Sequence, residues 1–284
     1  MSRPTSVASE TIRRYVGKCI YCQSTENLQD EHCLAHSLGG FHLLEKASCD
    51  KCGKITGKFE GDYTRRSLLP ARTALDMRSK RSKNKSTTEF PMWIKRDDGE
   101  RELVNVPVKD HVSLIPLVEM GPPGVIPEWG HKDGLKSGEF KVHPFSVRSG
   151  EQIRDLRKKY KTDELSVDIE IDVSGFCRMI AKIAYCHSVW KFGLGNIQEA
   201  FVLPAILGTK EDIFQWVGSD GRQFIHEEMS SIKADHTCLL RYDKTGKIVA
   251  RVKLFTKSLT PEYDVIIGRL TDRCHALLSH LGAA

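Results

Sequence analysis

Four cysteines in two Cys-x-x-Cys pairs are the strongest chemical signal in this sequence. The pairs are Cys19 with Cys22 and Cys49 with Cys52, and 26 residues separate the inner members. Each pair offers two thiolates from a tight turn, and two such pairs complete the tetrahedral shell of a zinc ion. A shell of four thiolates leaves no position for a substrate. The sequence therefore predicts a structural Zn²⁺ ion that stabilises a small fold.

An acid and an imidazole lie next to each other between the two cysteine pairs. Glu31 and His32 are adjacent, and the glycine pair Gly39 and Gly40 follows them. Hydrolysis of a phosphodiester bond needs a base that activates water and a cation that absorbs negative charge. A neutral imidazole, with a pKa of about 6.5, suits the role of base near neutral pH. Residue types that could cut nucleic acid are thus present.

The order Cys-x-x-Cys, acid-His, Gly-Gly, Cys-x-x-Cys resembles the HNH endonucleases of the ββα-metal superfamily over roughly residues 15 to 65. The run from 47 to 75 is also similar to a bacterial subgroup of uncharacterised HNH proteins. The resemblance implies a ββα-metal fold and an endonuclease that hydrolyses nucleic acid, with DNA favoured over RNA. It implies His32 as the general base and Glu31 as a ligand of one catalytic ion, Mg²⁺ or Mn²⁺.

Gly53 follows the last zinc cysteine, where the HNH family usually carries Asn or His as a second metal ligand, and the middle Asn of the family name is also absent. A helix expected from about residue 48 to 60 places Gly53, Thr56 and Glu60 on one face. Carboxylate oxygens suit a hard divalent ion. We therefore predict that Glu60 is the second acidic ligand of the catalytic ion; the alternative is a solvated helix residue.

Positive charge is concentrated after the second cysteine pair. The net charge of the chain is +6, and residues 65 to 85 carry eight Lys and Arg against the single acid Asp76. Such clustering beside a candidate site indicates a phosphate-rich partner, although a solvated linker is the alternative. The residues predicted to contact nucleic acid are Lys54, Lys58, Arg65, Arg66 and Arg72.

The fold class expected from these patterns is α+β. A small N-terminal zinc-stapled ββα-metal (HNH) module is expected at residues 1–77, a basic linker at 78–90, and a larger α+β domain of unknown role at 91–284. In the third region, alternating apolar residues predict a strand at 166–173, and apolar spacing predicts a helix from 174 to about 192. We also expect a hairpin turning at 243–246, a strand at 264–268 and a closing helix at 272–281.

No apolar run reaches the length of about 18 residues that a transmembrane helix needs, and the N-terminus lacks the apolar core of a signal peptide. These features predict a cytoplasmic protein with no membrane partner. The leading function is a metal-dependent endonuclease. The alternatives are a catalytically inactive zinc module that binds nucleic acid, and an interaction protein that binds a protein partner. The last domain could bind a regulator or form a homo-oligomer.

Overall fold

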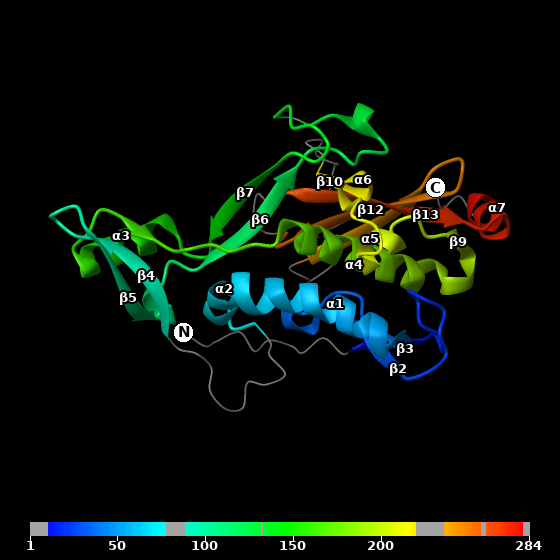
Figure 1. Ribbon diagram of the computed structural model, residues 1–284, viewed down its shortest axis with the longest axis horizontal. Helices are drawn as coiled ribbons and strands as arrows, with labels where there is room; N and C mark the ends of the chain where they lie inside the picture. The colour runs from blue at the N-terminus through cyan, green and yellow to red at the C-terminus, as the bar shows by residue number, and fades with distance from the viewer. Residues whose placement is uncertain (1–10, 78–88, 132, 220–235, 257–259, 281–284) are drawn as a thin grey trace.

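The chain adopts a mixed α+β fold in a computed structural model that describes residues 11–77, 89–131, 133–219, 236–256 and 260–280. Figure 1 shows helix α4 (Val173–Phe192) between two layers. An N-terminal unit of short strands and helices covers one side of α4, and a C-terminal sheet covers the other. The expected α+β class is confirmed.

The N-terminal unit contains two antiparallel strands followed directly by a helix. Strand β3 is the centre of a three-stranded sheet, with β2 antiparallel on one side and β1 parallel on the other. The elements are β1 (Ile12–Tyr15), β2 (Leu28–His32), β3 (His42–Cys49), α1 (Asp50–Asp62), the π-helical turn η2 (Tyr63–Ser67) and α2 (Leu69–Ala74). The succession β2, β3, α1 therefore has the strand-strand-helix order of the expected module.

Helix α4 is buried along most of its length because its sequence is apolar on all sides. Its first turn is capped by Asp172, whose carboxylate accepts a hydrogen bond from the amide of Gly175 at 3.0 Å. It ends at Gly193, which has a φ of 87°. Fourteen of its 20 residues are buried. A helix this apolar needs cover on both sides, and the N-terminal unit and the C-terminal sheet supply it.

The C-terminal sheet has the strand order β10-β13-β12-β11, with β9 paired to the other end of β13. The hairpin expected to turn at 243–246 and the strand expected at 264–268 are confirmed, and the expected closing helix is present from residue 272 to 280, where the described residues end. The elements are β9 (Ile197–Glu199), α5 (Leu203–Leu207), α6 (Ile213–Trp216), β10 (Val217–Ser219), β11 (His236–Tyr242), β12 (Lys247–Leu254), β13 (Glu262–Leu270) and α7 (Asp272–His280).

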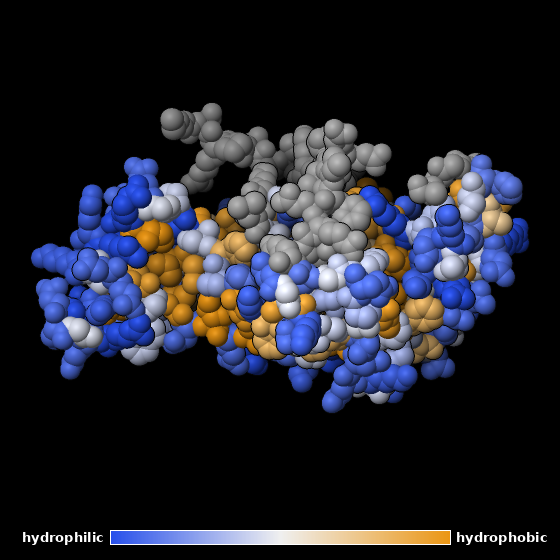
Figure 2. Space-filling model, turned by 90° about the horizontal axis from the view of Figure 1, so that it is seen from above, coloured by the Kyte–Doolittle hydropathy of each residue, from blue (hydrophilic) through white to orange (hydrophobic). Residues whose placement is uncertain are grey.

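A smaller lobe projects from the main body, and its end is largely hydrophilic on the face seen in Figure 2. It has its own core around Met92, Ile94, Val106 and Val112. The antiparallel strands β6 (Leu114–Met120) and β7 (Phe140–Ser146) lie between this lobe and the main body. The elements of the lobe are β4 (Glu89–Lys95), β5 (Arg101–Pro107), β8 (Leu165–Ser166) and α3 (Gly150–Tyr160).

The predicted strand at 166–173 is wrong for most of its length. Only Leu165–Ser166 pairs with β4, and the chain is irregular from there until α4 begins. The reason is that Val167 packs on the core of the small lobe, whereas Ile171 packs on the main core. The alternating apolar residues therefore serve two cores instead of one face of a sheet. Most of the expected basic linker, residues 78–88, lies outside the described residues, and the rest begins β4.

The main apolar core runs without interruption from the N-terminal unit through α4 into the C-terminal sheet. Leu44 of β3 and Phe59 of α1 belong to the same cluster as Phe176 of α4 and Val252 of β12. The described part of the unit expected at residues 1–77, from residue 11 onward, is thus packed against α4.

Two glycines of the N-terminal unit should respond in opposite ways to alanine. A Cβ at Gly40 would lie 1.9 Å from the carbonyl oxygen of Leu34, whereas a Cβ at Gly57, in the middle of α1, meets nothing within 4 Å. We expect Gly40→Ala to lower the free energy of unfolding by about 1–3 kcal/mol through overpacking. Gly57→Ala should raise it by about 0.5–1 kcal/mol, because alanine is the better helix former. Urea unfolding of both variants checks this, and equal stability of Gly40→Ala and wild type would contradict it.

Candidate functional site

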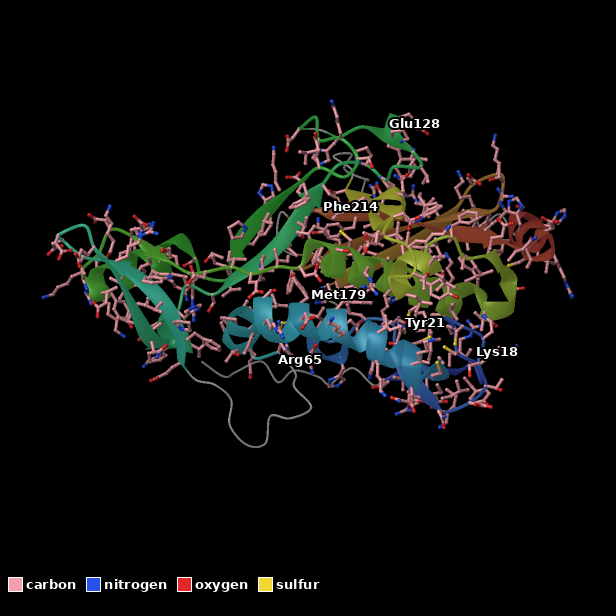
Figure 3. All side chains as sticks on the ribbon, viewed as in Figure 1. Lys18, Tyr21, Arg65, Glu128, Met179 and Phe214 are labelled. Atoms are coloured by element: carbon pink, nitrogen blue, oxygen red, sulfur yellow. The ribbon has the colours of Figure 1, made fainter. Side chains whose placement is uncertain are left out.

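The four paired cysteines come together in one cluster. Their sulfur atoms all lie within 4.8 Å of one another, and the Sγ atoms of Cys22 and Cys49 are 3.6 Å apart. Four thiolates around zinc, with Zn–S bonds of about 2.3 Å, lie about 3.8 Å from one another. Cys19 and Cys22 come from the turn before β2, Cys49 ends β3, and Cys52 lies in the first turn of α1. Figure 3 shows the sulfur atoms gathered beside Lys18 and Tyr21. This cluster can hold a metal ion such as zinc.

The surroundings of the cluster favour the thiolate form at Cys49. Burial acts to raise the pKa of this thiol, but the amide of Cys52 and the neighbouring cysteines outweigh burial and lower its pKa to about 7. Cys49 is also the residue that precedes α1, where the positive end of the helix dipole stabilises an anion. A deprotonated sulfur is the form that binds a metal. Burial raises the pKa of Cys19 and Cys52, so a metal ion must displace the protons of those two thiols when it binds. The donor set therefore fits zinc in spacing, and Cys49 is the member whose surroundings favour the thiolate.

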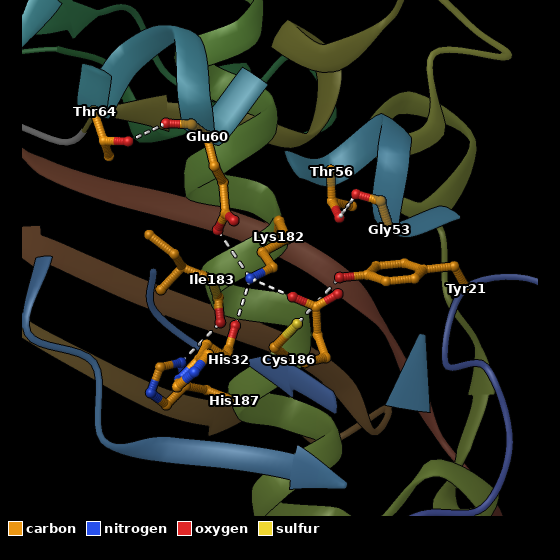
Figure 4. A network of polar contacts seen from close by, with 11 residues as sticks. Tyr21, His32, Gly53, Thr56, Glu60, Thr64, Lys182, Ile183, Cys186 and His187 are labelled. Carbon is orange, nitrogen blue, oxygen red and sulfur yellow. Dashed lines mark hydrogen bonds and ion pairs between the residues drawn. The ribbon is translucent and has the colours of Figure 1, made fainter. Parts of the chain in front are cut away.

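A second polar centre lies between α1, β2 and α4, and we call it the ion triad: Glu31, Glu60 and Lys182. The ammonium of Lys182 lies 2.8 Å from Glu31 Oε1 and 2.9 Å from Glu60 Oε1. It also donates to the carbonyl oxygen of His32. The Lys182 side chain is fully buried, and the side chains of Glu31 and Glu60 are 9% and 16% exposed. Figure 4 shows the three acceptors around the ammonium.

The ion triad uses the whole hydrogen-bonding capacity of the ammonium. A lysine ammonium has three N–H donors, and each has an oxygen acceptor here. Burial alone would lower the pKa of Lys182, but Glu31 and Glu60 outweigh burial and hold it well above its usual value. Burial raises the pKa of Glu60, and Lys182 opposes that rise. Lys182 therefore stays charged because both carboxylates face it. Its hydrogen bonds are complete because the carbonyl oxygen of His32 accepts the third.

The two predicted metal-binding carboxylates thus converge on one cation, and that cation is an ammonium group. Glu60 extends from the last turn of α1 toward Glu31 of β2, on the helix face that also carries Gly53 and Thr56. A magnesium or manganese ion between the same oxygens would need the space that Lys182 fills. The site as folded is a buried ion network.

His32, the predicted general base, presents its backbone to the ion triad. Glu31 and His32 pair in regular register with Leu44 and Leu43, and the irregularity of β2 falls one step earlier, between Gln29 and Glu31. Neighbouring side chains on a regular strand point to opposite faces. The Glu31 carboxylate therefore faces Lys182, whereas the half-buried His32 ring packs near the ring of His36, with 5.5 Å between the ring centroids.

The predicted nucleic-acid contacts divide into exposed and buried groups. Lys54, Lys58, Arg65 and Arg66 are exposed, and Figure 3 shows Arg65 on the side of α1 away from α4. Arg72 is buried, and its guanidinium donates to the carbonyl oxygens of Ser37 and Thr64 at 3.0 and 2.9 Å. These bonds give Arg72 a role in joining α2 to the β2–β3 connection.

Two lysines that lie beside the predicted site residues were missed in the sequence. Lys51 is exposed in the first turn of α1 and belongs with Lys54 and Lys58. Lys182 lies within the segment that apolar spacing predicts as a helix, and that spacing gives no sign of a buried charge. The signal that could have revealed it is its place among residues otherwise expected in the core, Met179, Ile183 and Cys186, because lysine is almost never fully buried unless a carboxylate pairs with it.

Comparisons with known proteins identify no relative. The chain matches no family model, no curated protein and no solved structure. Within the described part of the chain, none of the helices combines the length and the apolar character needed to cross a membrane. The assignment of a function therefore depends on the residues themselves.

Replacement of Lys182 by methionine should destabilise the protein in a pH-dependent manner. Two carboxylates would remain buried without a cation, and loss of one partner of a buried ion pair costs about 3–5 kcal/mol. The missing ammonium also removes the charge that opposes the rise in the pKa of the buried Glu60 carboxyl. The loss should therefore be greatest at about pH 8 and smaller at about pH 5, where that carboxyl can take up a proton in the folded state. Urea unfolding at both pH values measures it.

The control for this variant is Lys191→Met, which removes an exposed lysine from the same helix and should change stability by less than about 0.5 kcal/mol. Adding Glu31→Gln and Glu60→Gln to Lys182→Met should restore part of the loss. Wild-type stability of Lys182→Met at neutral pH would show that the ion triad does not stabilise the fold.

Proposed function

We propose that this chain binds nucleic acid, with an N-terminal zinc module of HNH type that presents a row of positive charge. The observation that carries the proposal is the exposed face of α1. Lys51, Lys54 and Lys58 follow one another at intervals of three and four residues, so they share one face of the helix. Arg65 continues the row in the turn after α1. These four residues are called the cation row.

The cation row has the dimensions of a phosphate-binding surface. From Lys51 to Lys58 the three lysines span seven residue steps, or about 10.5 Å of helix axis. Along double-stranded DNA, one negative charge occurs about every 1.7 Å of axis, so each lysine can face a phosphate oxygen. Contacts of this kind position a nucleic acid but read no base sequence. The function supported by this surface is binding with little sequence preference.

The zinc cluster and the ion triad support this function by fixing the helix that carries the row. Cys52 holds the first turn of α1 to the cluster, and Glu60 holds the last turn to Lys182. The buried residues of α1, among them Thr56 and Phe59, face α4 and the strands. The opposite face of α1 is then held toward solvent, and its lysines meet phosphates without the cost of ordering the backbone.

Substitution of the three lysines of the cation row should weaken binding and reduce its dependence on salt. The triple variant Lys51→Gln, Lys54→Gln and Lys58→Gln removes three phosphate contacts. The slope of log K against log salt concentration should therefore become shallower by about 2.7, from about 0.9 per contact. Fluorescence anisotropy of a labelled DNA duplex at several salt concentrations measures the slope.

The matched control removes the same charge from other exposed sites, in the triple variant Lys141→Gln, Lys158→Gln and Lys210→Gln. This control should bind DNA as wild type does. A loss of affinity that is equal in the two triple variants would indicate a general effect of net charge, and no binding by wild type would remove the proposal.

Phosphodiester cleavage is a second candidate function, and the convergence of Glu31 and Glu60 on one cation favours it. Cleavage of the HNH type would use His32 as the base and a magnesium or manganese ion on the two carboxylates. It requires the ammonium of Lys182 to leave the carboxylates, because both now bond to it. The binding function requires no such change.

A plasmid-nicking assay with Mg²⁺ or Mn²⁺ separates the two functions. Because Lys182 occupies the cation position, we expect wild type to retard the plasmid in a gel and to nick it no faster than His32→Ala does. An endonuclease would instead show metal-dependent nicking that His32→Ala abolishes and Glu60→Gln reduces. Glu45→Gln, on the neighbouring strand β3, is the control for loss of a carboxylate outside the site.

A further inference from the structure

We propose that Glu119, His131 and Asp133 form a second metal site, which binds a first-row divalent ion such as Zn²⁺ and lies apart from the cysteine cluster. Glu119 belongs to β6, and the other two residues lie in the connection between β6 and β7. Glu128, in the same connection, lies on the opposite side of the molecule from Arg65 and Lys18 (Figure 3). The site therefore belongs to a different part of the fold from the zinc module.

The ligand atoms of these three side chains already face one another. One nitrogen of His131 and a carboxylate oxygen from each acid all lie within 4.8 Å of one another. The side chain of His131 is only 1% exposed and that of Glu119 only 9%. The Nε2 atom of His131 lies 3.4 Å from Glu119 Oε1. A buried imidazole and a buried carboxylate thus point at the same space.

The distance between His131 and Glu119 suits two ligands of one ion better than a direct bond. A charge-assisted hydrogen bond between nitrogen and a carboxylate oxygen is about 2.7–2.9 Å long. Zinc bonds to nitrogen and oxygen of about 2.0–2.2 Å, arranged as a tetrahedron, place the two ligand atoms about 3.4 Å apart. The observed 3.4 Å matches the second arrangement.

The ring of His143 lies beside the other oxygen of the Glu119 carboxylate. Its Nε2 atom lies 2.7 Å from Glu119 Oε2. His143 is on β7, opposite Leu117 of β6, so it is the diagonal neighbour of Glu119 on the same face of the strand pair. A ring in this position can help to orient a metal-binding carboxylate. With Oε2 beside His143, Oε1 of Glu119 faces His131.

Loading of the site requires a change of tautomer at His131. The amide of Asp133 donates to His131 Nδ1 at 3.2 Å, which leaves the ring proton on Nε2. An ion bound at Nε2 needs that proton on Nδ1 instead. The neutral ring can make this change without net release of a proton. The contact with the Asp133 amide is then given up, and the exposed carboxylate of Asp133 can approach the ion.

The donor set selects the class of metal. Imidazole with carboxylates suits zinc and neighbouring first-row ions, whereas magnesium and calcium prefer oxygen ligands alone. Because Asp133 is exposed, the site opens to solvent on one side and leaves at least one position for water. It differs in this respect from the closed shell of four cysteines.

Zinc content of the full chain tests the proposal. The purified chain is equilibrated with zinc, excess metal is removed by gel filtration, and total zinc is measured by atomic emission. A mercurial reagent then releases only the zinc that cysteines hold. We expect two zinc ions per chain, and the mercurial should release one of them. His131→Ala and, separately, Glu119→Gln should each lose the other ion and keep the cysteine-bound ion.

Glu128→Gln is the matched control, because it removes an exposed carboxylate from the same connection and should keep both ions. Wild-type protein that holds only the zinc ion released by the mercurial would overturn the proposal, whatever the variants show. Retention of both ions by His131→Ala would overturn it as well. If Glu119→Gln disturbs the β6–β7 pair, the wild-type stoichiometry and the His131 variant still decide.

Discussion

The burial of a single ammonium group is the constraint on which the rest of this structure depends. Lys182 lies in the middle of an apolar helix, and a charge of this kind is tolerated in a protein interior only when its hydrogen bonds are satisfied. Its partners come from β2 and α1 of the N-terminal unit. Apolar surfaces can slide past one another at little cost, whereas three directed bonds allow one position. The ion triad therefore sets the register between the N-terminal unit and α4.

The cysteine cluster and the ion triad act at opposite ends of α1. Cys52 lies in its first turn and Glu60 in its last, and the helix between them packs on the shared core through Thr56 and Phe59. A helix of 13 residues has little stability alone in water. Here it needs no stability of its own, because both ends are tied to other elements. Its outer face can then carry lysines and glycine without loss of the helix.

The features that could be predicted from the sequence are those set by the spacing of residues close together in the chain. The two Cys-x-x-Cys pairs predicted the sulfur cluster, and the common face of Gly53 and Glu60 followed from helical spacing alone. The strand predicted at residues 166–173 was wrong because their apolar side chains pack on two different cores. The spacing of residues along the chain cannot show which core each side chain joins. Lys182 was missed for the same reason, since its partners lie 122 and 151 positions away (182 − 60 and 182 − 31). The resemblance to HNH proteins suggested a cation at Glu31 and helical spacing added Glu60 as its second ligand, but only the fold shows which cation lies between them.

The identity of that cation determines which chemistry these residues can perform. A divalent metal ion keeps exchangeable positions, so it can bind a phosphate oxygen and lower the pKa of a water molecule. The ammonium of Lys182 has given all three of its donors to protein oxygens and has no position left for either. Its removal from the carboxylates would also separate β2 and α1 from α4 at their charged contact. Cutting at this site would thus be coupled to partial opening of the fold, whereas binding along the outer face of α1 leaves every buried contact in place.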